Sequence, residues 1–446
     1  MTKSFSLVFL IGRNFMINFG GYMKKLLLGS TALAICISGL ASPAQAAASK
    51  DKMPSLRISG ETKAVTHIFK NSKPRGEFGY GTLFAMEDST VRFHVEDDFT
   101  FMGEKQKVDW LLGVTGDTNA PVAAEENRLR FRGNWGVLYF GTHQGAESIM
   151  ARGAFAVMGA TGGFDGNGMD TVIKPTGVLT GTDVIGATKY ADKVTYITPR
   201  VFGVQLGASY TPNSEHKGEG SDGLPHYHSS TKSPKVPFDQ SSWAGGINFL
   251  REFECGLSIT LSATGILAHS NPGQRGGLDT SNLFNRTTTA RVHDTKSYAL
   301  GGVAEYFGFE LGAEWIDNGN SRQVKNLAQI TDPTLVGGFD AGEAFSIAAG
   351  YTFGANRLAA GYYGSERKYN GSKIHGNIYS VTYDRKLAPG LSLFAEGNLY
   401  NLHGTQQAAN FQNAIQASAG TLSSKLDDGR KRNNAHAVLL GAKLKF

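Results

Sequence analysis

The fold is decided by the stretch Ala435-His-Ala-Val-Leu-Leu-Gly-Ala-Lys-Leu-Lys-Phe446, at the end of the chain. Apolar side chains take every second position in it, namely Val438, Leu440, Ala442, Leu444 and Phe446. A period of two puts alternate side chains on opposite faces, which predicts a strand with one apolar face and one small or charged face. Such a strand fits a wall between lipid and a polar lumen.

The same alternation recurs along the chain. From Leu56 to Phe69, apolar residues alternate with polar ones such as Arg57 and Lys63. Runs of this kind, bounded by glycine-rich turns, are typical of strands. We predict about sixteen of them, at residues 56–69, 89–99, 107–117, 127–134, 137–143, 193–198, 204–210, 241–250, 256–268, 296–307, 308–316, 343–353, 356–365, 374–386, 390–402 and 435–446.

The connections between these segments alternate in length. Long ones include 144–190, 211–240, 269–295, 317–342 and 403–434, whereas short ones include 134–136, 199–203, 353–356 and 386–390. Outer-membrane barrels keep long loops outside and short turns on the periplasmic side, while a sandwich or jelly roll gives no reason for this parity. The pattern predicts an all-β fold, a transmembrane antiparallel up-and-down β-barrel.

The composition favours strands as the membrane-spanning elements. After residue 46 no run of about 18 apolar residues occurs, so only a closed barrel would satisfy its backbone within lipid. The 57 glycines suit a chain of many turns and close-packed strands. Because no linker divides residues 47–446, we predict a single barrel domain there.

The beginning of the chain has the features of an export signal. Met23-Lys-Lys is basic, Leu26–Leu40 is largely apolar, and Ser42-Pro-Ala-Gln-Ala46 ends on a small-x-small cleavage site. We predict a signal peptide over residues 1–46, with Met23 as the true start. Its removal takes four basic residues and no acids from a net charge of +6, which leaves about +2. The charge therefore gives no reason to expect a nucleic-acid partner.

Three stretches resemble Gram-negative outer-membrane general porins. The terminal segment is similar to the last strand of these proteins. Arg128–His143 looks like the strand pair before their constriction loop, and Lys193–Pro212 looks like the pair after it. The resemblance implies a barrel of about sixteen strands that passes ions and small hydrophilic solutes by passive diffusion through the outer membrane.

The resemblance also implies partners. Phe446 would close the barrel and help the barrel-assembly machinery to recognise the chain. The protein would be a homotrimer, surrounded by outer-membrane lipid and lipopolysaccharide after export through the periplasm. The third loop, at about 144–190, would fold into the lumen, although it lacks the usual proline-and-acid sequence of the family's constriction loop.

Charged residues at alternate strand positions are the candidates for the pore lining. Strand parity predicts that six basic side chains face the lumen. We call them the basic wall: Arg57, Lys63, Arg92, Arg128, Arg130 and Arg132. Arginines on one strand face repel one another unless water or carboxylates surround them. By resemblance, acids of the third loop would face this wall, and we assign Glu147, Asp165, Asp170 and Asp183 to that role. The opposed charges would set up a transverse field that selects among solutes.

We expect no cofactor and no metal. Asp165-Gly-Asn-Gly-Met-Asp170 has oxygen ligands but lacks the spacing of an EF-hand, and a glycine-rich turn accounts for it. His226-Tyr-His228 would need ligands from elsewhere. Since Cys36 lies in the signal, Cys255 is the only other cysteine, and no intramolecular disulfide is expected.

Other functions fit parts of the pattern. A substrate-selective channel, for sugars or for anions at the basic wall, shares every feature above. An outer-membrane barrel enzyme such as a phospholipase, or a secreted β-sandwich that binds or cleaves glycans, would need a catalytic or binding set. The sequence contains no G-x-S-x-G, no H-E-x-x-H and no P-loop, so we predict a channel rather than an enzyme.

Overall fold

The computed structural model describes residues 54–72, 79–101, 103–116, 123–175, 177–187, 191–214, 238–271, 293–323, 340–369, 371–405 and 432–446. All the elements below belong to one compact unit, which spans Pro54–Gly220 and Pro225–Phe446. The signal peptide, with Met23, and the pair His226 and His228 lie outside the described residues, so these expectations stay predictions.

The described residues form sixteen strands, and each overlaps one predicted segment. They are β1 (Ser55–Asn71), β2 (Tyr80–Phe101), β3 (Glu104–Gly116), β4 (Ala123–Gly133), β5 (Gly136–His143), β6 (Ala191–Ile197), β7 (Val204–Asn213), β8 (Phe238–Glu252), β9 (Ser258–Asn271), β10 (Thr295–Tyr306), β11 (Phe309–Asp317), β12 (Glu343–Phe353), β13 (Asn356–Tyr369), β14 (Ser372–Ala388), β15 (Leu391–His403) and β16 (Arg432–Lys445). The largest difference is at β2, which begins at Tyr80 rather than Ser89. A bulge at Asp88, where φ is 48°, interrupts the period of two and hides the first half of that strand.

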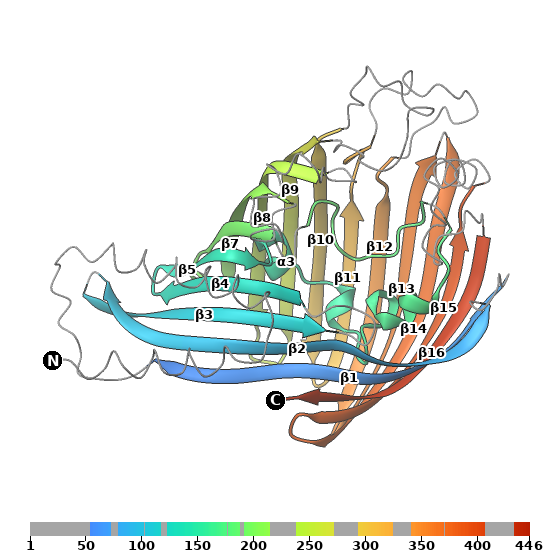
Figure 1. Ribbon diagram of the computed structural model, residues 1–446, viewed down its shortest axis with the longest axis horizontal. Helices are drawn as coiled ribbons and strands as arrows, with labels where there is room; N and C mark the ends of the chain where they lie inside the picture. Colours follow the sequence, from blue (N-terminus) through green and yellow to red (C-terminus); the bar gives the residue numbers. More distant parts are fainter. Residues whose placement is uncertain are drawn as a thin grey trace, which may run out of the picture. The chain divides into compact units, whose positions relative to one another are not determined.

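The strands form a closed antiparallel barrel in which each strand pairs with its neighbours in sequence. β16 closes the ring on β1, from Glu61 opposite Lys445 to Asn71 opposite Ala435. Figure 1 shows the two strands side by side, with β8–β15 arranged as a continuous wall. The predicted up-and-down barrel is therefore confirmed.

Connection length follows the predicted parity with one exception. The turns at 102–103, 134–135, 307–308, 354–355 and 389–390 all lie at one end, which we call the short-turn end. The long connections lie at the other end, the long-loop end, except that β13 and β14 are joined there by residues 370–371 alone. In the part of the chain that the structure describes, no helix is long and apolar enough to cross a membrane.

The connection between β5 and β6, which we call the lumen loop, carries the short helices α3 (Ala146–Met150), η2 (Ala154–Ala156), η3 (Gly163–Asp165) and η4 (Asn167–Thr171). α3 packs on β6–β9, η2 on β10–β12, η3 on β13–β15, and η4 on β16 and β1. The loop therefore runs around the inside of the barrel, as predicted, and it leaves the inner face of β2–β5 opposite it.

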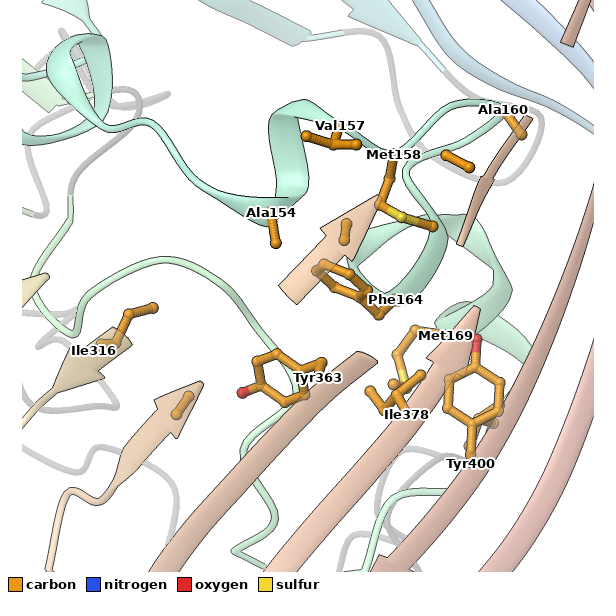
Figure 2. Close-up of a cluster of buried hydrophobic side chains, with 14 of the residues drawn as sticks. Ala154, Val157, Met158, Ala160, Phe164, Met169, Ile316, Tyr363, Ile378 and Tyr400 are labelled. Atoms are coloured by element: carbon orange, nitrogen blue, oxygen red, sulfur yellow. The ribbon is translucent and has the colours of Figure 1, made fainter. Parts of the chain in front are cut away.

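The apolar core of the barrel lies between the lumen loop and the wall. Val157, Met158 and Phe164 of the loop are buried. In Figure 2 the Phe164 ring lies toward Tyr363 and Ile378 of the wall, and it stacks on the Tyr363 ring with the centroids 6.0 Å apart. Each fully buried large apolar side chain contributes roughly 1.5–3 kcal/mol. By contrast, the outward side chains of the strands are largely apolar and exposed, as a lipid-facing surface requires.

Candidate functional site

The inward face of β1–β4 carries the six predicted basic residues. Paired residues share one side of a sheet, so the register Arg57–His94–Leu111–Arg128 defines one inward row. Arg92 lies in the next row toward the long-loop end, and Arg130 and Arg132 lie in the rows toward the short-turn end. Lys63 is on the same side of β1 and is buried.

Most of this basic wall is neutralised by carboxylates of the wall itself. Arg130 Nε is 2.5 Å from Asp109 Oδ1, and Arg132 Nη2 is 2.9 Å from Glu96 Oε2. The remaining pairs join Lys63 with Asp88 at 2.6 Å, Arg92 with Glu126 at 3.3 Å, and Lys107 with Glu96 at 2.7 Å. Each of these cations therefore lies beside a carboxylate of another strand, which removes much of the repulsion expected from the arginines alone.

Arg57 and Arg128 are the exceptions among the six. No carboxylate of a described residue lies within 4.0 Å of either guanidinium, although every other predicted basic residue has such a partner. Arg128 instead places its guanidinium over the Tyr139 ring, 5.1 Å from the centroid, and its Nη1 is buried without an acceptor. The uncompensated positive charge of this wall therefore lies in one row, on either side of His94.

The opposite boundary of the lumen is the lumen loop, which is held by polar groups of the wall. Asp384 Oδ2 accepts a hydrogen bond from the Ala160 N–H at 2.7 Å, and Lys443 Nζ donates to the Ala160 carbonyl at 2.8 Å. Glu396 Oε2 accepts from Thr161 Oγ1 at 2.7 Å and from the Thr161 N–H at 3.0 Å. Charge-assisted hydrogen bonds of this kind are about twice as strong as neutral ones.

The loop is held at both ends as well as in the middle. Ser209 Oγ accepts from the Ala146 N–H at 2.6 Å, and Asn318 Oδ1 accepts from the Ile185 N–H at 2.8 Å. Arg357 Nη2 donates to the Val157 carbonyl at 2.8 Å. Because these contacts follow one another around the barrel, the loop has one defined path rather than a set of alternatives.

Inward glycines make room for this path. A Cβ at Gly312 would lie 2.8 Å from Val157 Cγ2, and one at Gly361 would lie 2.7 Å from the Phe164 ring. A Cβ at Gly301 would collide with the Arg152 carbonyl oxygen. Only glycine lets the loop backbone approach the strands this closely.

The four predicted acids of the loop occupy different environments. Glu147 in α3 is buried against the wall, where Lys193 lies near it. Asp165 is exposed and accepts a hydrogen bond from Thr182 Oγ1 at 2.5 Å, and Asp183 is exposed as well. The four acids therefore do not form one acidic surface facing the basic wall.

Asp170 of η4 lies closest to the charged groups of β1 and β2. Its carboxylate is near Glu87, His67 and Asp88. Desolvation by the surrounding protein raises the pKa of Asp170, and the Glu87 carboxylate raises it further. His67 and Glu87 are themselves buried and hydrogen-bonded at 2.8 Å, so η4 rests on a polar part of the wall.

The residues that hold the loop are not evident from the sequence. Asp384, Glu396 and Lys443 stand at inward positions of the predicted strands, so strand parity alone would have placed them in the lumen. Nothing in the sequence links them to residues 160–163, which lie more than 200 positions away. Among the described residues, no group of three or more His, Cys, Asp or Glu side chains is arranged to hold a metal ion.

Phe446 extends the hydrogen-bond ladder between β16 and β1. Its N–H donates to the Gly60 carbonyl at 3.0 Å, the Gly60 N–H donates to the Phe446 carbonyl at 2.8 Å, and its ring covers Gly60. The predicted position at the barrel closure fits this geometry, whereas its role as an assembly signal stays a prediction.

Deleting Phe446 should lower the yield of folded barrel more than Phe446→Ala does. The deletion removes both terminal backbone hydrogen bonds, each worth about 1 kcal/mol, while the substitution removes the ring alone. The heat-modifiable fraction on unheated SDS gels measures the yield. Phe353→Ala is a matched control, because it removes an exposed aromatic ring at the same end without touching the closure. Equal yields for the deletion and the control would contradict the prediction.

The chain is distantly similar to uncharacterised proteins of Rickettsia. It is 21% identical to one from Rickettsia felis over 241 residues and 22% identical to one from Rickettsia typhi over 242 residues. Each alignment covers 49% of this chain and 52% of the relative. The chain thus spans about half the length of the curated relatives it matches.

Solved outer-membrane barrels share the fold. A loop L8 deletion mutant of OmpT from Vibrio cholerae has a TM-score of 0.53 at 14% identity, covering 89% of this chain and all of that one. The anion-selective porin from Comamonas acidovorans has a TM-score of 0.53 at 12% identity, covering 88% and 100%. The channel DcaP of Acinetobacter baumannii has a TM-score of 0.51 at 11% identity, covering 89% and 99%.

The family model of Gram-negative porins matches residues 29–405, which is most of the chain. The match includes fifteen of the sixteen strands and the lumen loop. A closed antiparallel barrel with a loop folded inside agrees with this match. The chain belongs to the Gram-negative porin family, and it is an outer-membrane β-barrel protein.

Proposed function

We propose that this porin forms a water-filled channel for the passive diffusion of ions and small hydrophilic solutes. The water path runs between the lumen loop and the inward face of β2–β5. Function in this proposal needs no catalytic residue and no cofactor, only a hydrated lumen and a field across it.

One observation carries the proposal: charged side chains gather on the inward face of β1–β4. About a third of the side-chain surface of Arg92, Arg132 and Glu96 is exposed there. Ionised groups need water or complete pairing, and a packed apolar interior provides neither. Partial exposure on the inside of a closed barrel is therefore best explained by water in the lumen.

A second candidate is selection of anionic solutes, because Arg57 and Arg128 lack a described carboxylate partner. A carboxylate or phosphate group of a solute would supply the negative charge that this row lacks. The neighbour from Comamonas acidovorans is itself an anion-selective porin. On this proposal the channel remains a diffusion pore, with a preference set by two side chains.

The partners follow from the proposed location of the pore. We propose a homotrimer that lies in outer-membrane lipid and lipopolysaccharide and is inserted by the barrel-assembly machinery. A trimeric form is known for the OmpT neighbour of Vibrio cholerae, which has a TM-score of 0.50 with this chain. The outward apolar band and the closing Phe446 also support this proposal.

Liposome swelling tests the diffusion function. Vesicles that contain the folded chain, residues 47–446, should swell in isotonic solutions of small sugars, and the rate should fall steeply as sugar size increases. Vesicles prepared with heat-unfolded protein are the control. Swelling that is absent for every sugar, with a folded and heat-modifiable barrel, would contradict an open diffusion pore.

A further inference from the structure

The first and last strands meet at the long-loop end around two buried asparagines. Asn71 is the last residue of β1, and Asn433 is the second residue of β16. The side chains of both lie on the inward face, where Asn71 is 1% exposed and Asn433 is 0% exposed. Asn433 Nδ2 donates a hydrogen bond to Asn71 Oδ1 at 2.7 Å. The two amides therefore join β1 to β16 directly, at the end of their backbone ladder.

Asn433 also continues the junction past the last paired residues, Asn71 and Ala435. Its Oδ1 accepts hydrogen bonds from the Ser72 N–H at 3.0 Å and from Ser72 Oγ at 3.2 Å. Ser72 Oγ in turn accepts from the Asn434 N–H at 3.0 Å. Side chains thus take the place of a backbone rung here. We call this contact, made by residues 71–72 and 433–434, the outer seam.

The same two amides bind the lumen loop directly after η4. Asn71 Nδ2 donates to the Thr171 carbonyl at 3.1 Å, and Asn71 Oδ1 accepts from the Ile173 N–H at 3.1 Å. Asn433 Nδ2 donates to the Ile173 carbonyl at 2.8 Å. Thr171 is 4% exposed and Ile173 is 1% exposed. A buried backbone group that loses its partner costs about 1–3 kcal/mol, so these contacts matter for the position of the loop.

Each amide serves the seam and the loop with the same atoms. Asn71 Oδ1 accepts from Asn433 and from Ile173 together, and Asn433 Nδ2 donates to Asn71 and to Ile173 together. Separation of the two strands would pull the amides apart and leave the Ile173 N–H and carbonyl on different sides of the gap. Withdrawal of the loop would leave both amides buried with donors unused. Opening the seam and releasing the loop therefore share their cost.

The loop is also packed tightly against the seam. η4 contacts both β16 and β1. A Cβ at Gly168 would lie 2.7 Å from Tyr400 Oη and 3.3 Å from Leu439 Cδ1, so a larger residue would push η4 off the wall. Val172, which lies between the two loop residues bound by the amides, is 0% exposed. The segment 168–173 therefore covers the junction from the inside.

We propose that the lumen loop is a third partner of the outer seam, so that loop docking and barrel closure at this end are one cooperative step. The loop takes its final place only in a barrel whose first and last strands have met. Conversely, the loop cannot leave the wall at η4 while the outer seam stays closed. This coupling goes beyond the proposed channel function and does not depend on it.

Hydrogen–deuterium exchange of the folded chain in lipid nanodiscs tests the coupling, because it measures the loop and the seam separately. Gly168→Val changes no residue of β1 or β16, yet amide exchange should accelerate at least about tenfold in residues 168–173 and in the outer seam alike. Asn433→Ala should have the same effect from the side of the seam. Asn401→Ala is the control, because Asn401 lies opposite Asn434 on the outward face and does not contact the loop.

A reversible disulfide gives a second measurement. Lys70 and His436 lie directly opposite each other on the outward side of β1 and β16, at a spacing that suits a disulfide. In Lys70→Cys/His436→Cys, oxidation should hold the seam and slow exchange in residues 171–173, and a reductant should reverse this. Cys255 lies in the connection between β8 and β9, at the short-turn end, so it is out of reach.

Fast exchange confined to the loop in Gly168→Val, with the outer seam as slow as in the wild type, would overturn the proposal. A disulfide that protects the seam but leaves residues 171–173 unchanged would overturn it as well. If Gly168→Val does not yield a folded barrel, the disulfide decides alone. Neither measurement uses ion or solute flow, so a failure of the channel function would be seen separately, in liposome swelling.

Discussion

The double variant Asp384→Ala/Glu396→Ala should turn a steady channel into one that fluctuates among several current levels. The two carboxylates accept four hydrogen bonds from residues 160–163 of the lumen loop. Hydrogen bonds to charged groups contribute roughly 1.5–3 kcal/mol each. Without these four bonds, residues 160–163 should detach from the wall. Val157 and Phe164 still pack on the wall in the variant. We therefore expect local motion of the loop, and not a pore that is permanently wider.

Single-channel recording in planar bilayers measures this effect as the variance of the open-channel current. Glu61→Ala is the matched control, because Glu61 is a wall carboxylate that pairs with Lys445 at 2.8 Å and does not hold the loop. Far-UV circular dichroism shows whether each barrel is folded. A double variant that is folded and as quiet as the control would contradict the assigned anchoring role.

Arg130→Gln should destabilise the barrel by about 3 kcal/mol, whereas Arg128→Gln should change its stability by less than about 1 kcal/mol. Asp109, the partner of Arg130, is 1% exposed and its Oδ2 makes no hydrogen bond, so losing Arg130 leaves a buried charge whose remaining cation, Arg132, lies 3.9 Å away. Arg128 has no such partner, and its Nη1 is already unsatisfied. The two positions lie on the same face of β4, which makes each variant the control for the other.

Ion selectivity should change more in Arg128→Gln than in Arg130→Gln. Arg128→Gln removes an uncompensated positive charge from the lumen and should raise the permeability of K⁺ relative to Cl⁻. Arg130→Gln instead removes one member of an ion pair whose carboxylate, Asp109, is buried in the wall, so we expect a smaller shift of the permeability ratio in this variant. Urea titration measures the stabilities, and reversal potentials in a KCl gradient measure the selectivity. Equal shifts of the reversal potential in both variants would contradict the distinction between paired and unpaired arginines.

Much of this fold could be predicted from periodicity. The alternation in the terminal stretch from Ala435 to Phe446, repeated along the chain, predicted sixteen strands and their inward faces. Local pattern suffices there because strand parity depends only on neighbouring residues. It failed at the start of β2, where the bulge at Asp88 inserts one extra residue and breaks the period.

The charge distribution in the lumen could not be predicted in the same way. Charge patterns along single strands suggested that Arg128, Arg130 and Arg132 would act alike. The partners of Arg130 and Arg132 lie on other strands, at Asp109 of β3 and Glu96 of β2, so only the register between strands distinguishes these two arginines from Arg128. The path of the lumen loop depends on still more distant groups, such as Glu396, and on glycines whose role is clear only when the loop lies against them.

The proposed channel requires that the lumen between the loop and the β2–β5 wall hold water. The most direct test is the single-channel conductance of the folded chain, residues 47–446, in planar bilayers over a range of KCl concentrations. An aqueous pore predicts discrete steps whose conductance rises in proportion to that of the bulk solution. A folded, heat-modifiable barrel that gives no steps at any concentration would show a plugged lumen and contradict a water-filled channel.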